Sequence, residues 1–224
     1  EPAEDASLIV VWSNNVTVST LHFAGIIERA RRKGAKLVVI DPKRIKIAEH
    51  ADLFLPIRPG TDVAFYNSLL HVLCRDGLLD RNYIDSHTEG FDEIESLVAA
   101  DYSPEQAEEI CGVPAEEIEA IAATISRATP PGGGGSMIVF WGMGISQHVT
   151  GTDNARCLIS LCLATGNVGR PGTGLHPLRG QNNVQGASDS GLIPMVFPDY
   201  QSVADDEIRQ KFNRAWGREL DAQP

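Results

Sequence analysis

Short apolar runs alternate with amphipathic segments of helical length along most of this chain. The apolar runs, each short enough for a buried strand, cover residues 8–12, 37–40, 53–57 and 137–141. Apolar residues at helical spacing cover residues 19–33, 62–75, 115–127 and 152–164. Buried strands joined by helices are typical of parallel sheets, because a parallel pair needs a long crossover connection. The pattern therefore predicts an α/β fold with a mostly parallel, doubly wound, Rossmann-like sheet and helices on both faces.

Local signals refine this outline toward the C-terminus. Residues 77–101 are mixed polar and aromatic and predict short helices, and Ser103-Pro104-Glu105-Gln106 predicts a capped helix start. From Asn167 onward, glycine, proline and asparagine predict an irregular segment that ends in a helix near residues 207–217. We expect residues 1–180 to form the α/β domain and residues 181–224 to begin an adjoining, truncated domain.

Charge and composition exclude several classes of function. The 30 acidic against 19 basic residues give a net charge of −11, which repels nucleic acid. The sequence contains no run of 18 apolar residues, which a membrane-spanning helix would need, and residues 1–5 lack the features of a secretory leader. The four cysteines form no C-x-x-C pair, so we expect reduced thiols in a cytoplasmic protein rather than metal ligands.

Three predicted strands end in residues that suit a ligand. These ends are Ser13-Asn14-Asn15, Asp41-Pro42-Lys43-Arg44 and residues 142–147. Ligands of such sheets bind beyond the carboxyl ends of the strands, and an acidic residue after the second strand commonly holds a ribose. Asp41-Pro42 also fits a plain turn. A standard NAD site is not favoured, because no G-x-G-x-x-G follows the first strand.

Two glycine-rich stretches stand out. Residues 169–186 combine glycines with an Arg-Gly-Gln-Asn-Asn run, in which the flat guanidinium of Arg179 suits a carboxylate. The same stretch also fits a loop whose amides satisfy their own backbone. Residues 132–136, Gly-Gly-Gly-Gly-Ser, predict a flexible break and equally resemble an engineered linker.

Five motifs together resemble one family. The stretches at 34–43 and 59–62 are similar to the molybdopterin-guanine-dinucleotide oxidoreductase superfamily. The stretches at 141–147, 165–169 and 178–187 resemble the formate dehydrogenase catalytic subunit within it, and related nitrate reductases usually differ in the last of them. The resemblance covers nearly the whole chain.

The resemblance implies a cofactor, a reaction and a set of residues. The family binds molybdopterin guanine dinucleotide with molybdenum or tungsten and oxidises formate to CO2. The implied catalytic residues are Arg179, which would orient formate, and Gln181, which would support it. The implied cofactor-binding residues are Asn15, Asp41, Lys43, Gly60, Asp62, Gly142, Met143, Gly144, Gln147, Gly180 and Asn182.

Departures from the family pattern limit what this chain does alone. Residues 16–22 replace the family's acidic residue and His-Pro pair, and the cysteine or selenocysteine that ligates the metal has no match, so we expect no metal ligand. The N-terminal domain with its 4Fe-4S cluster and the C-terminal domain are missing. We expect an inactive fragment whose partners are formate, those domains and electron-transfer subunits. A non-catalytic or engineered module, or a piece of another molybdopterin enzyme such as nitrate reductase, remains an alternative.

Overall fold

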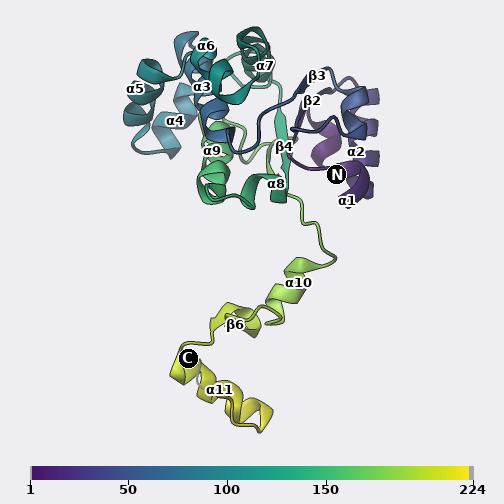
Figure 1. Ribbon diagram of the computed structural model, residues 1–224, viewed down its shortest axis with the longest axis vertical. Helices are drawn as coiled ribbons and strands as arrows, with labels where there is room; N and C mark the ends of the chain where they lie inside the picture. Colours follow the sequence, from purple (N-terminus) through teal and green to yellow (C-terminus); the bar gives the residue numbers. More distant parts are fainter. Residues whose placement is uncertain (1, 222–224) are drawn as a thin grey trace. The chain divides into compact units, whose positions relative to one another are not determined.

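Five parallel strands form one sheet in the order β3-β2-β1-β4-β5 (Figure 1). The computed structural model describes residues 2–221. The strands are β1 (Leu8–Trp12), β2 (Lys36–Ile40), β3 (Leu53–Leu55), β4 (Met137–Trp141) and β5 (Gly174–Pro177). Leu8 at the start of β1 is level with Lys36 on one side and with Met137 on the other. The five-residue ladders of β1 with its two neighbours form the centre of the sheet.

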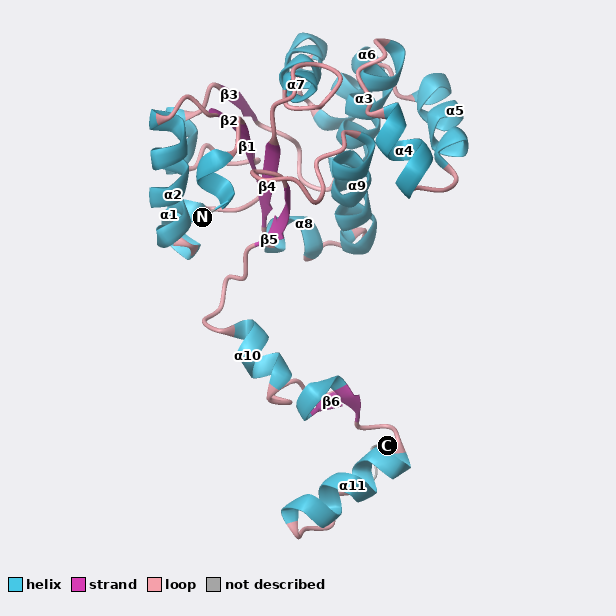
Figure 2. Cartoon of the chain, turned by 180° about the vertical axis from the view of Figure 1, so that it is seen from behind, coloured by secondary structure: helices cyan, strands magenta, loops and turns pink. Residues whose placement is uncertain are grey.

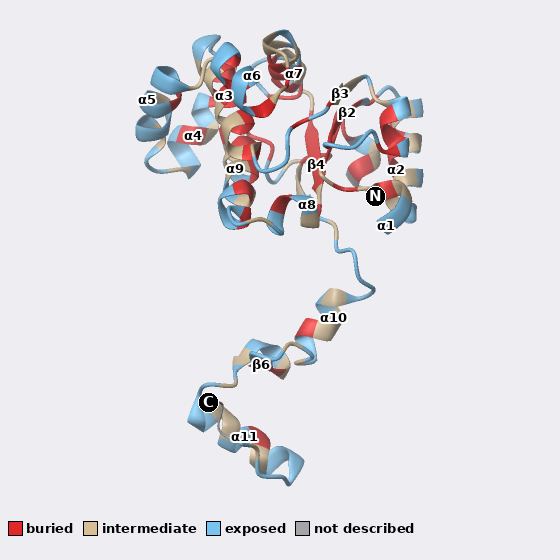
Figure 3. Cartoon of the chain, in the orientation of Figure 1, coloured by how far each residue is buried: buried red, intermediate tan, exposed pale blue. Residues whose placement is uncertain are grey.

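Alternate residues of the strands supply two separate cores. Leu8, Val10 and Trp12 face one core, whereas Ile9 and Val11 face the other. On the second face lies α2 (Leu21–Arg32), and on the first lie α3 (Asp62–Arg75), α7 (Ala115–Arg127) and α9 (Gly151–Ala164), as Figures 1 and 2 show. All five residues of β1 are buried, and the central strands are the most continuously buried part in Figure 3. The predicted fold class, with helices on both faces of a mostly parallel sheet, is confirmed.

Shorter helices complete this part of the chain. They are α1 (Val16–Ser19), α4 (Arg81–His87), α5 (Phe91–Asp101), α6 (Pro104–Cys111) and α8 (Met143–Ser146), with 3-10 turns at Pro2–Asp5 and Lys46–His50. The capping box predicted at Ser103 is present, with Gln106 and Ser103 bonded reciprocally. The helix predicted over residues 19–33 is interrupted at Thr20, where the backbone leaves the helical region.

The edge strand β5 was not predicted. Its residues Gly174, Leu175, His176 and Pro177 have no strand-like alternation, and they pair only with β4. Tertiary pairing at the sheet edge, rather than local preference, makes this segment a strand. The segment expected to be irregular therefore supplies the fifth strand of the sheet.

A buried polar network fixes the amino end of β4. The Oδ1 atom of Asn167 accepts the backbone N–H of Met137 at 2.8 Å, and its amide donates to Thr165. Arg170 donates to the same Oδ1 atom and to the carbonyl of Gly135. The Thr165–Gly169 motif therefore stabilises the sheet at the edge where β4 begins.

The run of four glycines forms a turn rather than a flexible break. The amides of Gly133 and Gly134 both donate to the carbonyl of Thr129, just after α7. A Cβ atom on Gly132 would lie 2.1 Å from the carbonyl oxygen of Ser126. Because the backbone folds back this closely on the end of α7, a larger residue at position 132 would force it apart.

The chain divides into two compact units, residues 1–180 and residues 181–224, and each is described by itself. The second contains α10 (Val184–Asp189), the antiparallel pair β6 (Val196–Phe197) and β7 (Gln201–Ser202), a 3-10 turn at Pro198–Tyr200, and α11 (Asp206–Trp216). Phe197 stacks on Phe212 of α11 at 4.5 Å between ring centroids. The predicted C-terminal helix is confirmed as α11.

None of the helices formed by residues 2–221 combines the length and the apolar character that crossing a membrane requires.

The network at Asn167 predicts a stability effect. Replacing Asn167 with Ala leaves the buried N–H of Met137 without an acceptor, which costs about 1–3 kcal/mol. Urea unfolding should show this loss, whereas Asn82→Ala at an exposed position of α4 should change the free energy of unfolding by less than about 0.5 kcal/mol. Equal effects of the two substitutions would contradict the role given to Asn167.

Candidate functional site

The order of the strands reverses between β1 and β4. The chain runs from β1 to β2 and β3 on one side, and then returns to place β4 and β5 on the other. In open α/β sheets such a reversal leaves a crevice at the carboxyl ends of the two strands. Here Ser13 and Asn14 follow β1, and Gly142 follows β4. The topology therefore places a ligand crevice between these two loops.

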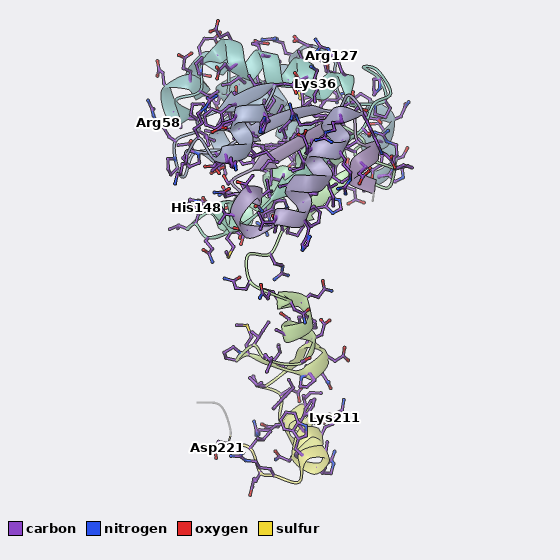
Figure 4. All side chains as sticks on the ribbon, turned by 90° about the vertical axis from the view of Figure 1, so that its right-hand side faces the viewer. Lys36, Arg58, Arg127, His148, Lys211 and Asp221 are labelled. Carbon is purple, nitrogen blue, oxygen red and sulfur yellow. The ribbon has the colours of Figure 1, made fainter. Side chains whose placement is uncertain are left out.

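Two hollows lie at this edge and share the residues Ser13 and Gly144. In Figure 4, Lys36 and Arg127 lie at the top of the first unit, near the starts of β2 and β4. His148, which lines one hollow, lies at the opposite, lower end of the same unit. The hollows are thus on the carboxyl edge of the sheet, away from the network of Asn167.

The first hollow is acidic. Its lining consists of Ser13, Asp41, Pro42, Ile57, Pro59, Asp62, Gly144 and His148. Asp41 follows β2, and Asp62 begins α3, so separate elements bring the two carboxyl groups to one wall. Both side chains are buried. A ligand that offers N–H or O–H donors fits this hollow better than an anion does.

Asp62 is held by Trp12. The indole Nε1 of Trp12 donates to Oδ1 of Asp62 at 3.0 Å, and the same indole packs edge-on against Phe65. Burial raises the pKa of Asp62 above its ordinary value, and the Trp12 hydrogen bond and the charge of nearby His148 oppose this rise. His148 is itself anchored, with its Nε2 atom 2.7 Å from the carbonyl oxygen of Gly144.

Asp41 closes a turn with Lys43. Its Oδ1 atom accepts the backbone N–H of Lys43 at 2.8 Å, which is the turn that the Asp41-Pro42 pair allows. Burial raises the pKa of Asp41, and the Lys43 N–H lowers it in part. The side chain of Lys43 is exposed. Nearby, Arg58 donates to the carbonyls of Glu109 and Ile110 at the end of α6.

The second hollow has no ionisable side chain in its wall. It is lined by Ser13, Asn14, Asn15, Ser19, Gly142, Met143, Gly144, Leu178 and Gly180. A Cβ atom on Gly142 would lie 2.6 Å from Nδ2 of Asn14, and one on Gly180 would lie 2.6 Å from Cε of Met143. The absence of side chains at these glycines keeps the wall open.

Two buried polar atoms at this edge suit a polar ligand. Within residues 2–221, neither Oδ1 of Asn14 nor Nε1 of Trp141 has a hydrogen-bond partner. Buried polar atoms are nearly always paired in folded proteins, so unpaired ones call for an explanation. The Oδ1 atom of Asn15, in contrast, accepts the hydroxyl of Thr17 at 2.8 Å.

The structure brings most of the sequence-predicted cofactor residues to the two hollows. Those that line them are Asn15, Asp41, Asp62, Gly142, Met143, Gly144 and Gly180. Gly60 follows Pro59 of the first hollow, with a φ of 82°. Gln147 lies outside both linings, and its Nε2 atom is 3.3 Å from the sulfur of Met143.

The three polar residues of the Arg-Gly-Gln-Asn stretch divide between the units. Arg179 is exposed between Leu178 and Gly180, two residues of the second hollow, and belongs to the first unit. Gln181 and Asn182 belong to the second unit. The sequence analysis placed Ser13 and Asn14 at a strand end that suits a ligand but did not count them among the cofactor-binding residues, and it did not predict His148 as a lining residue. A polar pair directly after an apolar strand was the available signal for the first two.

None of the cysteines lines either hollow. Cys111 and Cys162 are buried, and all four cysteines are free thiols. Burial raises the pKa of Cys162 to about 12 and that of Cys74 to about 11. These two thiols are therefore protonated near neutral pH.

Comparison with known proteins assigns the family. The model of the molybdopterin oxidoreductase family matches residues 2–216. This chain belongs to the molybdopterin oxidoreductase family. It is 39% identical over 216 residues to formate dehydrogenase H of Escherichia coli (strain K12), covering 96% of this chain and 29% of that protein. It is 41% identical over 205 residues to the F420-dependent formate dehydrogenase subunit alpha of Methanocaldococcus jannaschii, covering 92% of this chain.

The chain spans about 29% of the length of each of these two relatives. Among solved structures, acetylene hydratase from Pelobacter acetylenicus matches with a TM-score of 0.66 and 26% identity. That match covers 72% of this chain and 22% of the hydratase. The resemblance to the family, read from the motifs, is confirmed.

Burial of Asp62 predicts a pH dependence. Because folding raises its pKa, the carboxyl group contributes stability below its ordinary value of 3.8, and this contribution is lost as pH rises through the raised value. Asp62→Asn keeps the acceptor for Trp12 and does not titrate. The variant should therefore gain stability relative to the original chain as pH rises from about 4. Chemical unfolding across pH measures this difference, and a gain that shrinks as pH rises would contradict it.

Proposed function

We propose that this chain is part of the catalytic subunit of a formate dehydrogenase, and that residues 1–180 bind molybdopterin guanine dinucleotide. The observation that supports this most is the position of the family motifs. The residues after β1 and β4 form the walls of a crevice at the sheet's point of reversal, where this fold class binds nucleotides. The formate dehydrogenases among the relatives support the choice of substrate.

The two hollows suit the two ends of such a dinucleotide. The guanosine part offers N–H and O–H donors, which fit the buried carboxyl groups of Asp41 and Asp62. The remainder of the cofactor would lie toward the uncharged hollow, against Asn15 and the glycines at 142 and 144. Lys43, Gly60, Gln147, Gly180 and Asn182 would contribute around these contacts. The bound cofactor would supply a molybdenum or tungsten centre that accepts the two electrons from formate.

Arg179 would orient formate. Formate has three heavy atoms, so at a ceiling of about 1.5 kcal/mol per atom its binding reaches about 4.5 kcal/mol. That corresponds to roughly millimolar affinity. A charge-assisted hydrogen bond contributes roughly 1.5–3 kcal/mol, so one guanidinium supplies a large share. Arg179 is exposed, and its side chain makes no hydrogen bond or ion pair with any residue of 2–221. Its guanidinium group is therefore available to bind a carboxylate. Gln181 would support the bound carboxylate.

The remaining parts of the enzyme would come from outside this chain. We expect an N-terminal domain with a 4Fe-4S cluster, a C-terminal domain that covers the cofactor, and electron-transfer subunits, all in the cytoplasm. Residues 181–224 would begin the domain that adjoins the cofactor domain. The chain alone would be inactive, because none of its residues matches the cysteine or selenocysteine that ligates the metal in the family.

Substitutions of Arg179 test the formate assignment. In the full-length enzyme, Arg179→Ala should lower kcat/KM for formate roughly tenfold to hundredfold, because the lost hydrogen bonds are charge-assisted. Arg179→Lys should lose less, since it keeps the charge but not the fork. Formate-dependent dye reduction measures both, with cofactor content as the control. Unchanged kinetics in the two variants would remove Arg179 from formate binding.

Gly142→Ala tests the location of the cofactor. The new Cβ atom would lie 2.6 Å from Nδ2 of Asn14 and push that amide into the crevice. The purified full-length variant should therefore contain less pterin than the original protein, as measured by fluorescence after oxidative release. Gly25→Ala in α2, where the new Cβ meets only Arg29 at 3.7 Å, is the matched control. Equal pterin content in both variants would argue against this crevice.

A further inference from the structure

Ser13 combines an unfavourable backbone conformation with an unused side chain. Its φ of 49° makes it the one non-glycine residue with positive φ in residues 2–180. Its hydroxyl makes no hydrogen bond to any part of the chain that the structure describes, although it lines both hollows. Left-handed conformations of residues other than glycine are costly, and they cluster at functional sites.

The backbone at Ser13 does not require a serine. Its N–H donates to the carbonyl of Ile40 at 2.7 Å, and the chain then turns out of the β1 ladder. Glycine makes the same hydrogen bond and adopts this conformation without strain. The serine therefore adds only its side chain, at a cost in stability to the empty protein.

The opposing loop approaches Ser13 closely. A Cβ atom on Gly144 would lie 2.6 Å from the backbone oxygen of Ser13 and 2.7 Å from its Cβ atom, so glycine at position 144 lets the two loops meet. Gly142 leaves room in the same way for Asn14. Asn14 is 6% exposed, and its Oδ1 atom is buried without a partner among residues 2–221. The adjacent polar side chains of Ser13 and Asn14 thus line the second hollow without hydrogen bonds to other groups among residues 2–221.

The position of Ser13 determines which part of a bound dinucleotide its hydroxyl can reach. It lies where the acidic hollow of Asp41 and Asp62 joins the uncharged one. The carboxyl groups repel phosphate, so the link between the two ends of a dinucleotide crosses nearer the uncharged side. We propose that the Ser13 hydroxyl donates a hydrogen bond to a phosphate oxygen of the bound dinucleotide, an inference that rests on the proposed function. This hydrogen bond would offset the cost of the left-handed conformation at Ser13.

Ser13→Gly tests the backbone strain and the phosphate contact separately, because the substitution should raise the stability of the empty protein but weaken its hold on the cofactor. In the full-length protein made without cofactor, the variant should unfold at a higher temperature than the original. In the loaded protein, it should lose cofactor faster, by about tenfold, since a hydrogen bond to a charged group is lost. Ser13→Ala should lose cofactor equally fast but gain no thermal stability. Pterin remaining after timed dialysis and the melting temperature are the two readouts.

Asp199→Gly is the matched control, because it removes another left-handed side chain, with a φ of 63°, in the second unit. It should raise the melting temperature and leave cofactor loss unchanged. If Ser13→Gly loses cofactor at the rate of the original protein, the proposed hydrogen bond to phosphate is wrong. If the empty variant melts at a lower temperature than the original, the proposed strain at Ser13 is wrong. If the original protein contains no pterin, the proposed function fails first and this inference with it. If the original protein contains pterin and both Ser13 variants retain it equally well, the inference about Ser13 fails while the proposed function stands.

Discussion

The parallel pairing of β1 with β4 is the interaction on which the rest of this structure depends. Its register sets Trp12 level with Trp141, so the residues that follow the two strands meet at the same height. Because the strand order reverses at this pair, the chain leaves β1 toward α2 on one face and β4 toward α9 on the other, which opens a crevice between the two connections. Asp41 after β2 and Asp62 at the start of α3 then make one half of the crevice acidic.

Residue size then shapes the crevice. The loop after β4 carries glycines where the loop after β1 carries Ser13 and Asn14, and a Cβ atom at Gly142 or Gly144 would clash with the loop after β1. The opposite edge of the sheet is organised differently. There Asn167 and Arg170 satisfy backbone groups with buried hydrogen bonds. Motifs that look alike in the sequence thus line a crevice at one edge and stabilise the sheet at the other.

The sequence predicted the central strands because apolar runs bounded by polar residues are a local signal. It also predicted Asp41 as a site residue from its position at a strand end, whereas Asp62 was implied only by the resemblance to the family. It could not predict β5, whose Gly-Leu-His-Pro residues become a strand only by pairing with β4. Nor could it reveal the bond between Trp12 and Asp62, which lie 50 residues apart, or the left-handed turn at Ser13. These features depend on contacts between distant segments.

Hydrogen exchange of the full-length protein, with and without its cofactor, tests the central claim most directly. A dinucleotide in the crevice should slow exchange of the backbone amides in residues 13–15 and 142–144, which line the two hollows. The amides of residues 167–170, at the other edge of the sheet, should change much less. Slower exchange at the amino edge alone, or no change in either wall loop, would contradict a cofactor site at the junction of β1 and β4.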